Sequence, residues 1–164
     1  MKTLFLLRHA KSSWDDLSLS DFDRPLNERG RRTAPFMGEL MRKRGLSPQI
    51  IISSPAARAG ETALAVTKAA GLKVEPVYDA RIYEASPHTL VEIITAIDDL
   101  RSSAMLVGHN PGMEGVVNFL TGRVEPMPTA ALAVLELDID RWQDMNAGSA
   151  RKAEILRPKE QMGR

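Results

Sequence analysis

Residues 2–10 read KTLFLLRHA, an apolar run that ends abruptly on the strongly hydrogen-bonding side chains of Arg8 and His9. An extended chain places successive side chains on opposite faces, so residues 3–7 are mostly apolar on both, as in a buried strand of a parallel sheet. The run is too short for a secretory leader, whose apolar core needs about 7–15 residues. We therefore predict a buried strand that holds Arg8 and His9 at its carboxyl end.

The composition is that of an ordinary globular protein. The chain has 164 residues, 43% of them hydrophobic, which favours a single domain over residues 1–164. Its 22 basic and 21 acidic residues leave a net charge of +1, so no general field attracts nucleic acid or a membrane surface. The absence of cysteine excludes a disulfide, a thiolate nucleophile and a cysteine zinc site. We expect a cytoplasmic monomer that needs no cofactor or metal.

Apolar runs and helical patterns alternate along the chain. Strands are predicted at residues 3–7, 49–53, 73–77 and 104–107, with late strands at a sheet edge at residues 131–138 and 153–156. Helices are predicted to begin at Asn27, Ser54-Pro55, Ser86-Pro87 and after the turn at 108–112. This alternation predicts a three-layer α/β/α fold with a mostly parallel central sheet. The loop at residues 10–25 is long for such a fold, and long loops are often functional.

Polar side chains follow three of the predicted strands. Arg8 and His9 follow the first strand, Arg58 lies one turn into the helix after the second, and His109 follows the fourth. In open parallel sheets, ligands bind outside the carboxyl ends of the strands. We therefore expect these four side chains to meet at one edge of the sheet.

Two arginines and two histidines form a pocket suited to an anion. A guanidinium stays charged and matches phosphate oxygens with two parallel hydrogen bonds. Four convergent donors suit a phosphoryl group better than a carboxylate, and the sequence has neither a glycine-lysine phosphate loop nor a carboxylate cluster for Mg²⁺. Without cysteine or a serine elbow, the expected nucleophile is a neutral imidazole, which can form a covalent phosphoryl intermediate.

These motifs resemble those of the histidine phosphatase (phosphoglycerate mutase-like) superfamily. LLRHA at residues 6–10 resembles the Arg-His-Gly signature, with Ala10 in place of the glycine. Three further motifs are similar to the family's, namely RPLNERG at 24–30, IISSPAARAGETA at 51–63 and VGHNPG at 107–112. The RHAKS variant and the short chain, which leaves little room for a cap over the pocket, resemble the small SixA-type phosphohistidine phosphatases.

The resemblance implies a phosphoglycerate mutase-like fold and a metal-independent phosphatase. His9 would accept the phosphoryl group and water would then attack the phosphohistidine, while Arg8, Arg58 and His109 hold the phosphoryl oxygens. The implied substrate is a phosphohistidine on a protein or a related phosphomonoester.

Three further side chains are candidates with an ordinary structural alternative. Glu84, in RIYE, lies where mutase-like members place a glutamate, and it is either a general acid for ester substrates or a solvated loop residue. Lys11 and Ser13 follow His9 closely and either bind the phosphate or belong to a polar loop. Two other functions therefore stay open: a small-molecule phosphomonoester phosphatase that uses Glu84 as its acid, and a non-catalytic phosphoprotein-binding module.

Overall fold

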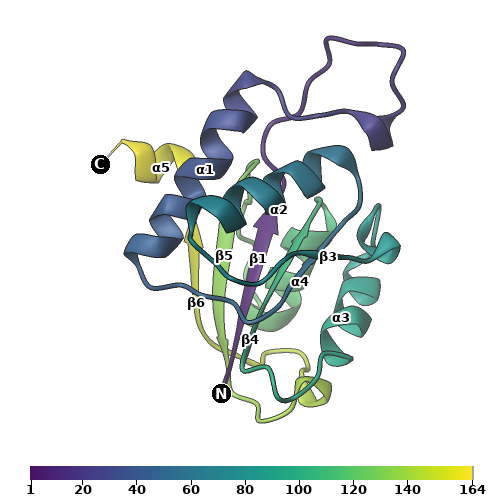
Figure 1. Cartoon of the computed structure of the whole chain (residues 1–164). Helices are drawn as coiled ribbons and strands as arrows, with labels where there is room; N and C mark the ends of the chain where they lie inside the picture. Colours follow the sequence, from purple (N-terminus) through teal and green to yellow (C-terminus); the bar gives the residue numbers. More distant parts are fainter. Residues whose placement is uncertain (164) are drawn as a thin grey trace.

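A computed structural model describes residues 1–163 as a central sheet with helices on both faces (Figure 1). The sheet has six strands in the order β3-β2-β4-β1-β5-β6. In chain order the strands are β1 (Lys2–Arg8), β2 (Ile51–Ser53), β3 (Val77–Tyr78), β4 (Ser103–Gly108), β5 (Leu132–Leu137) and β6 (Ala150–Leu156). Strands β1 to β4 are parallel, and β5 runs antiparallel to both of its neighbours. The predicted α/β/α architecture with a mostly parallel sheet is confirmed.

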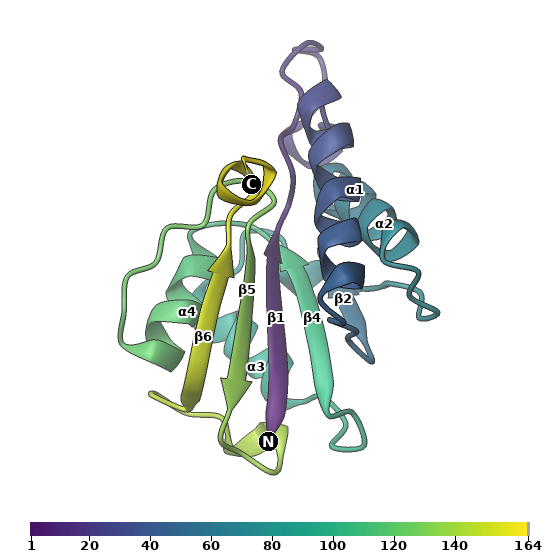
Figure 2. The ribbon, with the colours of Figure 1, turned by 90° about the vertical axis from the view of Figure 1, so that its left-hand side faces the viewer.

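The helices form two layers, one on each face of the sheet (Figure 2). The helices are α1 (Glu28–Lys43), α2 (Ala57–Ala69), α3 (Pro87–Thr95), α4 (Gly112–Thr121) and the short α5 (Pro158–Met162), with 3-10 turns η1 (Asp21–Asp23), η2 (Ala80–Ile82) and η3 (Trp142–Asp144). Residues of α1 and α2 share one apolar cluster, and residues of α3 and α4 share the other. No helix in the described part of the chain combines the length and apolarity needed to cross a membrane.

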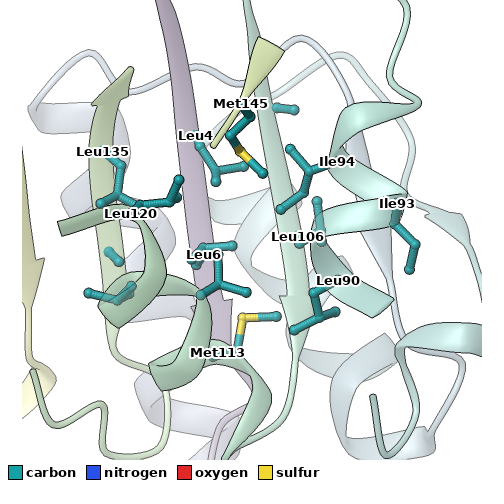
Figure 3. Packing of buried hydrophobic residues seen from close by; sticks show 14 of the residues in the cluster. Leu4, Leu6, Leu90, Ile93, Ile94, Leu106, Met113, Leu120, Leu135 and Met145 are labelled. Carbon is teal, nitrogen blue, oxygen red and sulfur yellow. The ribbon is translucent and has the colours of Figure 1, made fainter. Parts of the chain in front are cut away.

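The central position of β1 explains why its sequence is apolar on both faces. Leu4 and Leu6 pack beneath α3 and α4, as Figure 3 shows, whereas Phe5 and Leu7 belong to the cluster under α1 and α2. The parallel pairing with β4 sets Arg8 opposite Gly108. The side chains that follow these two strands therefore emerge together at the carboxyl edge of the sheet.

The predicted boundaries of the third strand and of the second helix were wrong. The third strand is only Val77–Tyr78 rather than 73–77, because it is an edge strand that pairs with just two residues of β2, and Pro76 before it lacks an N–H to donate. Helix α2 begins at Ala57 rather than at Pro55, since the backbone N–H of Ser54 still bonds the sheet at Val107 O.

The late strands were predicted at a sheet edge, and this holds only for β6. Strand β5 lies inside the sheet because it pairs with β1 on one side and with β6 on the other. A period-two pattern reports which residues are buried, but it carries no information on which strand pairs with which.

Candidate active site

The two predicted histidines meet at the carboxyl edge of the sheet. The backbone N–H of His9 donates to Gly108 O at 3.0 Å, which ties the chain after β1 to the end of β4. The ring centroids of His9 and His109 are 5.1 Å apart. Residues 100 positions apart in sequence therefore share one site because two neighbouring parallel strands end side by side.

His9 is held as a neutral imidazole with one free nitrogen. Its Nδ1 lies 2.7 Å from Ala10 O, and because a carbonyl oxygen only accepts, Nδ1 carries the proton. The lone pair is then on Nε2. Burial lowers the pKa of His9 to about 3, opposed by the Ala10 hydrogen bond and assisted by His109 and the arginines. Near neutral pH this side chain is therefore uncharged and has a lone pair available on Nε2.

His109 is oriented by a buried serine. Its Nε2 lies 2.8 Å from Ser54 Oγ, and Ser54 is fully buried at the end of β2. The Ser54 oxygen accepts from the backbone N–H of Ala56 at 3.2 Å, and Nε2 is the one acceptor within residues 1–163 for the Ser54 proton, which favours donation from Ser54 to Nε2. Burial, followed by the charge of Arg58, lowers the pKa of His109 to about 4. In that arrangement Nδ1 of a neutral His109 carries the proton.

Arg8 is positioned by a clamp around the backbone of Met127. Arg8 Nη1 donates to Met127 O at 3.0 Å, and Asn110 Nδ2 donates to the same oxygen at 2.9 Å. Glu114 Oε1 accepts from Met127 N at 2.7 Å and from Asn110 Nδ2 at 2.9 Å. Burial lowers the pKa of Arg8, and the Glu114 carboxylate opposes this. Glu114 was missed in the sequence, although it follows the GHNPG motif in the first turn of α4.

Within residues 1–163, Arg58 and Arg8 each have one N–H donor without a partner. Arg58 lies in the first turn of α2, its side chain 8% exposed, and its Nη1 and Nη2 donate to Asp21 at 2.7 and 3.0 Å. Among the described residues, Nε of Arg8 and Nε of Arg58 are buried without any hydrogen-bond partner. A buried donor without a partner is costly, so these two atoms mark an unsatisfied cationic pair beside the histidines.

Asp21 is a second residue that the sequence did not reveal. Its Oδ2 accepts from Tyr83 Oη at 2.7 Å as well as from Arg58, and its Oδ1 accepts from Arg24 Nη2 at 3.0 Å. The Tyr83 hydroxyl is the first cause that keeps the pKa of Asp21 well below its usual range, and the same contact raises the pKa of Tyr83 to about 12. The Tyr83 ring in turn lies edge-on to His109 with centroids 5.6 Å apart. The long loop after β1 therefore reaches back to the site.

The remaining motif residues hold the loop ends in place. Thr62 Oγ1 accepts from Ala10 N at 3.0 Å and donates to Arg58 O at 2.7 Å. Glu61 Oε1 accepts from Leu26 N at 3.3 Å. A Cβ at Gly30 would lie 2.2 Å from the carbonyl oxygen of Lys11, so only glycine lets α1 pack this closely on the chain after His9.

The three weaker candidates lie outside the helices and strands. Glu84 is exposed, has a left-handed backbone with φ of 56°, and directly follows Tyr83. Ser13 Oγ accepts from Asp15 N at 3.1 Å, which engages it within the loop. Lys11 is exposed and lines a cavity beside α1 and α5. No hydrogen bond within residues 1–163 joins any of the three to His9, and their predicted roles stay predictions.

Comparisons with known proteins agree with the motifs. The model of the histidine phosphatase superfamily, branch 1, matches residues 4–95. The chain belongs to this superfamily. A chloroplastic protein of Arabidopsis thaliana is 33% identical over 158 residues, covering 87% of this chain and 70% of that protein. A Mycobacterium tuberculosis protein is 33% identical over 155 residues, covering 88% and 94%. Both are uncharacterised.

Solved structures place this histidine phosphatase in the SixA-type branch. An Agrobacterium tumefaciens protein, provisionally named phosphohistidine phosphatase SixA, is 36% identical with a TM-score of 0.78, covering 83% of this chain and 92% of that one. A protein histidine phosphatase SixA in complex with tungstate has a TM-score of 0.83 at 21% identity, covering 97% and 99%. The phosphoglycerate mutase-like fold and the SixA-type resemblance are thereby confirmed.

Proposed function

We propose that this chain is a metal-independent phosphatase that hydrolyses phosphohistidine on a protein through a phosphoryl intermediate on His9. The observation that carries the proposal is the neutral His9 ring with Nδ1 bonded to Ala10 O, which leaves Nε2 free beside His109. The guanidiniums of Arg8 and Arg58 lie close enough to both histidines to lower their pKa values, and they would supply the positive charge for the phosphoryl oxygens. Similarity to the provisionally named SixA protein supports phosphohistidine as the substrate class.

The proposed reaction has two displacements at phosphorus. In the first, the Nε2 lone pair of His9 forms a bond to phosphorus while the P–N bond of the substrate breaks, and the electron pair leaves with the substrate imidazole, which takes a proton from solvent. In the second, water attacks phosphorus, the bond to Nε2 breaks, and phosphate and a proton are released. The Ala10 carbonyl oxygen accepts from Nδ1 and stabilises the positive charge on the phosphorylated ring. Arg8 and Arg58 hold the equatorial oxygens as charge redistributes.

The groups near the leaving position favour phosphohistidine over an alkyl ester. Asp21 is held ionised by Tyr83, Arg24 and Arg58, so it is a poor proton donor. Glu84 is exposed on the rim rather than buried beside the histidines. A leaving imidazole needs less protonation than an alkoxide. Ester hydrolysis with Glu84 as the acid is the alternative, favoured by its position next to Tyr83.

We propose that residues 1–164 act as one domain and as a cytoplasmic monomer, without a cofactor, nucleic acid or a membrane partner. Within the described residues, no three histidine, aspartate or glutamate side chains gather as a metal-binding group. Activity that survives EDTA unchanged would support metal independence, and loss of activity that is restored by a divalent metal would contradict it.

Trapping the intermediate tests the mechanism. The protein is mixed briefly with a ³²P-labelled phosphohistidine peptide, denatured in alkali, and the label on the protein is counted. We expect a transient, acid-labile label that is absent from His9→Ala. The matched control is His88→Ala, because His88 is exposed on α3 and pairs only with Glu92 among the described residues. Turnover by His9→Ala would contradict the mechanism, and anion binding without any label would indicate a phosphoprotein-binding module.

A further inference from the structure

A concave surface opens beside the chain that follows His9. It is a cavity of about 830 Å³, hereafter the basic groove. It is lined on one side by α1 and on the other by α5, with residues 128–129 between them. In Figure 2 the chain that leaves β1 rises between α1 and α5, so the groove flanks the exit of the strand that carries His9.

The charge on the groove is concentrated and only partly neutralised. Its lining includes five cationic side chains and one carboxylate, namely Lys11, Arg29, Arg32, Arg157, Lys159 and Glu160. Arg32 is paired with Glu28, and Arg157 with Glu125 and Glu160. Lys11, Arg29 and Lys159 have no ion-pair partner within residues 1–163. On a chain with a net charge of only +1, this is a local excess of positive charge.

Short stretches of backbone connect the basic groove to the candidate active site. Lys11 is two residues after His9, so their Cα atoms are at most about 7 Å apart. Ala130, next to the groove residue Thr129, donates its backbone N–H to both Arg8 O and His9 O, at 3.1 and 3.0 Å. The groove residues Lys11 and Thr129 are thus one or two residues away from the backbone that holds His9, so a polypeptide that extends from a phosphohistidine at His9 has only a short distance to span to reach the groove.

We propose that the basic groove binds an acidic segment of the substrate protein that lies next to its phosphohistidine. The inference rests on the proposed function, because the same ligand must reach His9. Unpaired cations on a concave surface attract carboxylates and speed association. The cavity is much larger than a single phosphate, and Pro128, Pro158 and Met162 add apolar lining. This mixture suits a peptide with acidic and apolar side chains better than a small polyphosphate.

Two synthetic peptides of equal length provide the test. Each has one histidine, phosphorylated chemically with phosphoramidate, followed by four glutamates in one peptide and four glutamines in the other. We expect kcat/KM for phosphate release to be about tenfold higher for the acidic peptide at low salt, and the preference to shrink as salt screens the charges. Fluorescence anisotropy of the unphosphorylated peptides measures binding without any catalysis.

Matched double variants assign the effect to the groove. Arg29→Gln with Lys159→Gln removes two of its unpaired cations and should abolish most of the preference, while turnover of the glutamine peptide stays unchanged. Arg151→Gln with Lys152→Gln is the control, because it removes the same charges at exposed positions near the start of β6, away from α5. The control should keep the full preference for the acidic peptide.

The outcomes separate the groove from the chemistry. Equal turnover and equal binding of the two peptides would overturn the groove inference and leave the proposed function standing. Failure to turn over either peptide, with binding of the acidic one that depends on Arg29 and Lys159, would overturn the proposed function alone. Groove-dependent binding of inorganic pyrophosphate without binding of the acidic peptide would assign the groove to a small polyanion and overturn the inference.

Discussion

The carboxylate of Asp21 lies on the guanidinium of Arg58, with Oδ2 3.0 Å from Nη2, and the backbone oxygen of the same residue lies 2.7 Å from Nη1. One residue of the long loop thus occupies both terminal nitrogens of an arginine proposed to bind phosphate. The long loop is therefore attached to Arg58 through a carboxylate of the protein itself.

Replacing Asp21 by asparagine should strengthen the binding of oxyanions. Asparagine keeps an oxygen for Tyr83 and leaves the backbone oxygen on Arg58, but it removes a negative charge that repels and competes with the ligand. We expect the inhibition constant of vanadate to fall about threefold to tenfold. Asp23→Asn in the same loop is the control, because its carboxylate contacts Ser20 instead. Weaker vanadate binding by Asp21→Asn would show that its charge holds Arg58 in place.

Both site histidines should be neutral at physiological pH. Because the pKa of His9 is lowered to about 3 and that of His109 to about 4, neither ring should gain a proton as the pH falls from 8 to 5. Nitrogen-15 NMR of the imidazoles checks this and should also show the Nδ1-protonated tautomer of His9. Titration of either ring near its ordinary pKa of 6.5 would contradict the prediction.

The same shifts predict how stability depends on pH. The lowered pKa values mean that the folded state binds fewer protons than the unfolded state between pH 6.5 and about 3. Stability contributed by neutral His9 and His109 is therefore complete above pH 6.5 and is lost as the pH falls toward their folded values. The free energy of urea unfolding of the parent should fall as the pH is lowered across this window. The same free energy should fall less steeply in His109→Asn. An unchanged slope in that variant would count against the shift at His109.

Glu114 should act as a positioning residue through Met127 and Arg8. Glu114→Ala removes the acceptor for Met127 N and should lower kcat/KM about tenfold with the fold retained. Glu114→Gln keeps an oxygen at the same place and should restore most of the activity. Equal losses in both variants would show instead that the charge near Arg8 is what matters.

Gly30→Ala should destabilise the protein although alanine favours helices. The new Cβ would lie 2.2 Å from Lys11 O, so α1 must move off the chain after His9, at a cost of about 1–3 kcal/mol. Gly60→Ala in α2 is the matched control, because its Cβ would lie 3.5 Å from Tyr78 and should stabilise by about 0.5–1 kcal/mol. Chemical denaturation measures both, and equal effects would contradict the packing argument.

Glu84→Gln separates the two candidate substrates. If Glu84 acts only on alkoxide leaving groups, the variant should lose about tenfold to a hundredfold on an alkyl phosphate and almost nothing on a phosphohistidine peptide. If the variant is as active as the parent on each of the two substrates, Glu84 is a solvated loop residue. High ester activity in the parent without phosphohistidine turnover would favour the small-molecule phosphatase.

The sequence by itself determined the fold class and the edge of the sheet at which four candidate residues lie. The run at 3–7 had to lie in the middle of a sheet because it is apolar on both faces, and chain direction then carried Arg8, His9, Arg58 and His109 to one edge. These inferences need only local periodicity and the geometry of parallel strands.

Only the tertiary structure decided what those residues contact. Asp21, Glu114 and Ser54 act through hydrogen bonds between segments far apart in the chain, and no periodic pattern encodes such partners. The proton on His9 is likewise assigned by one carbonyl oxygen, and its lowered pKa by burial among other elements. Desolvation and hydrogen bonding are properties of the packed molecule, so they become readable only once the segments are in contact.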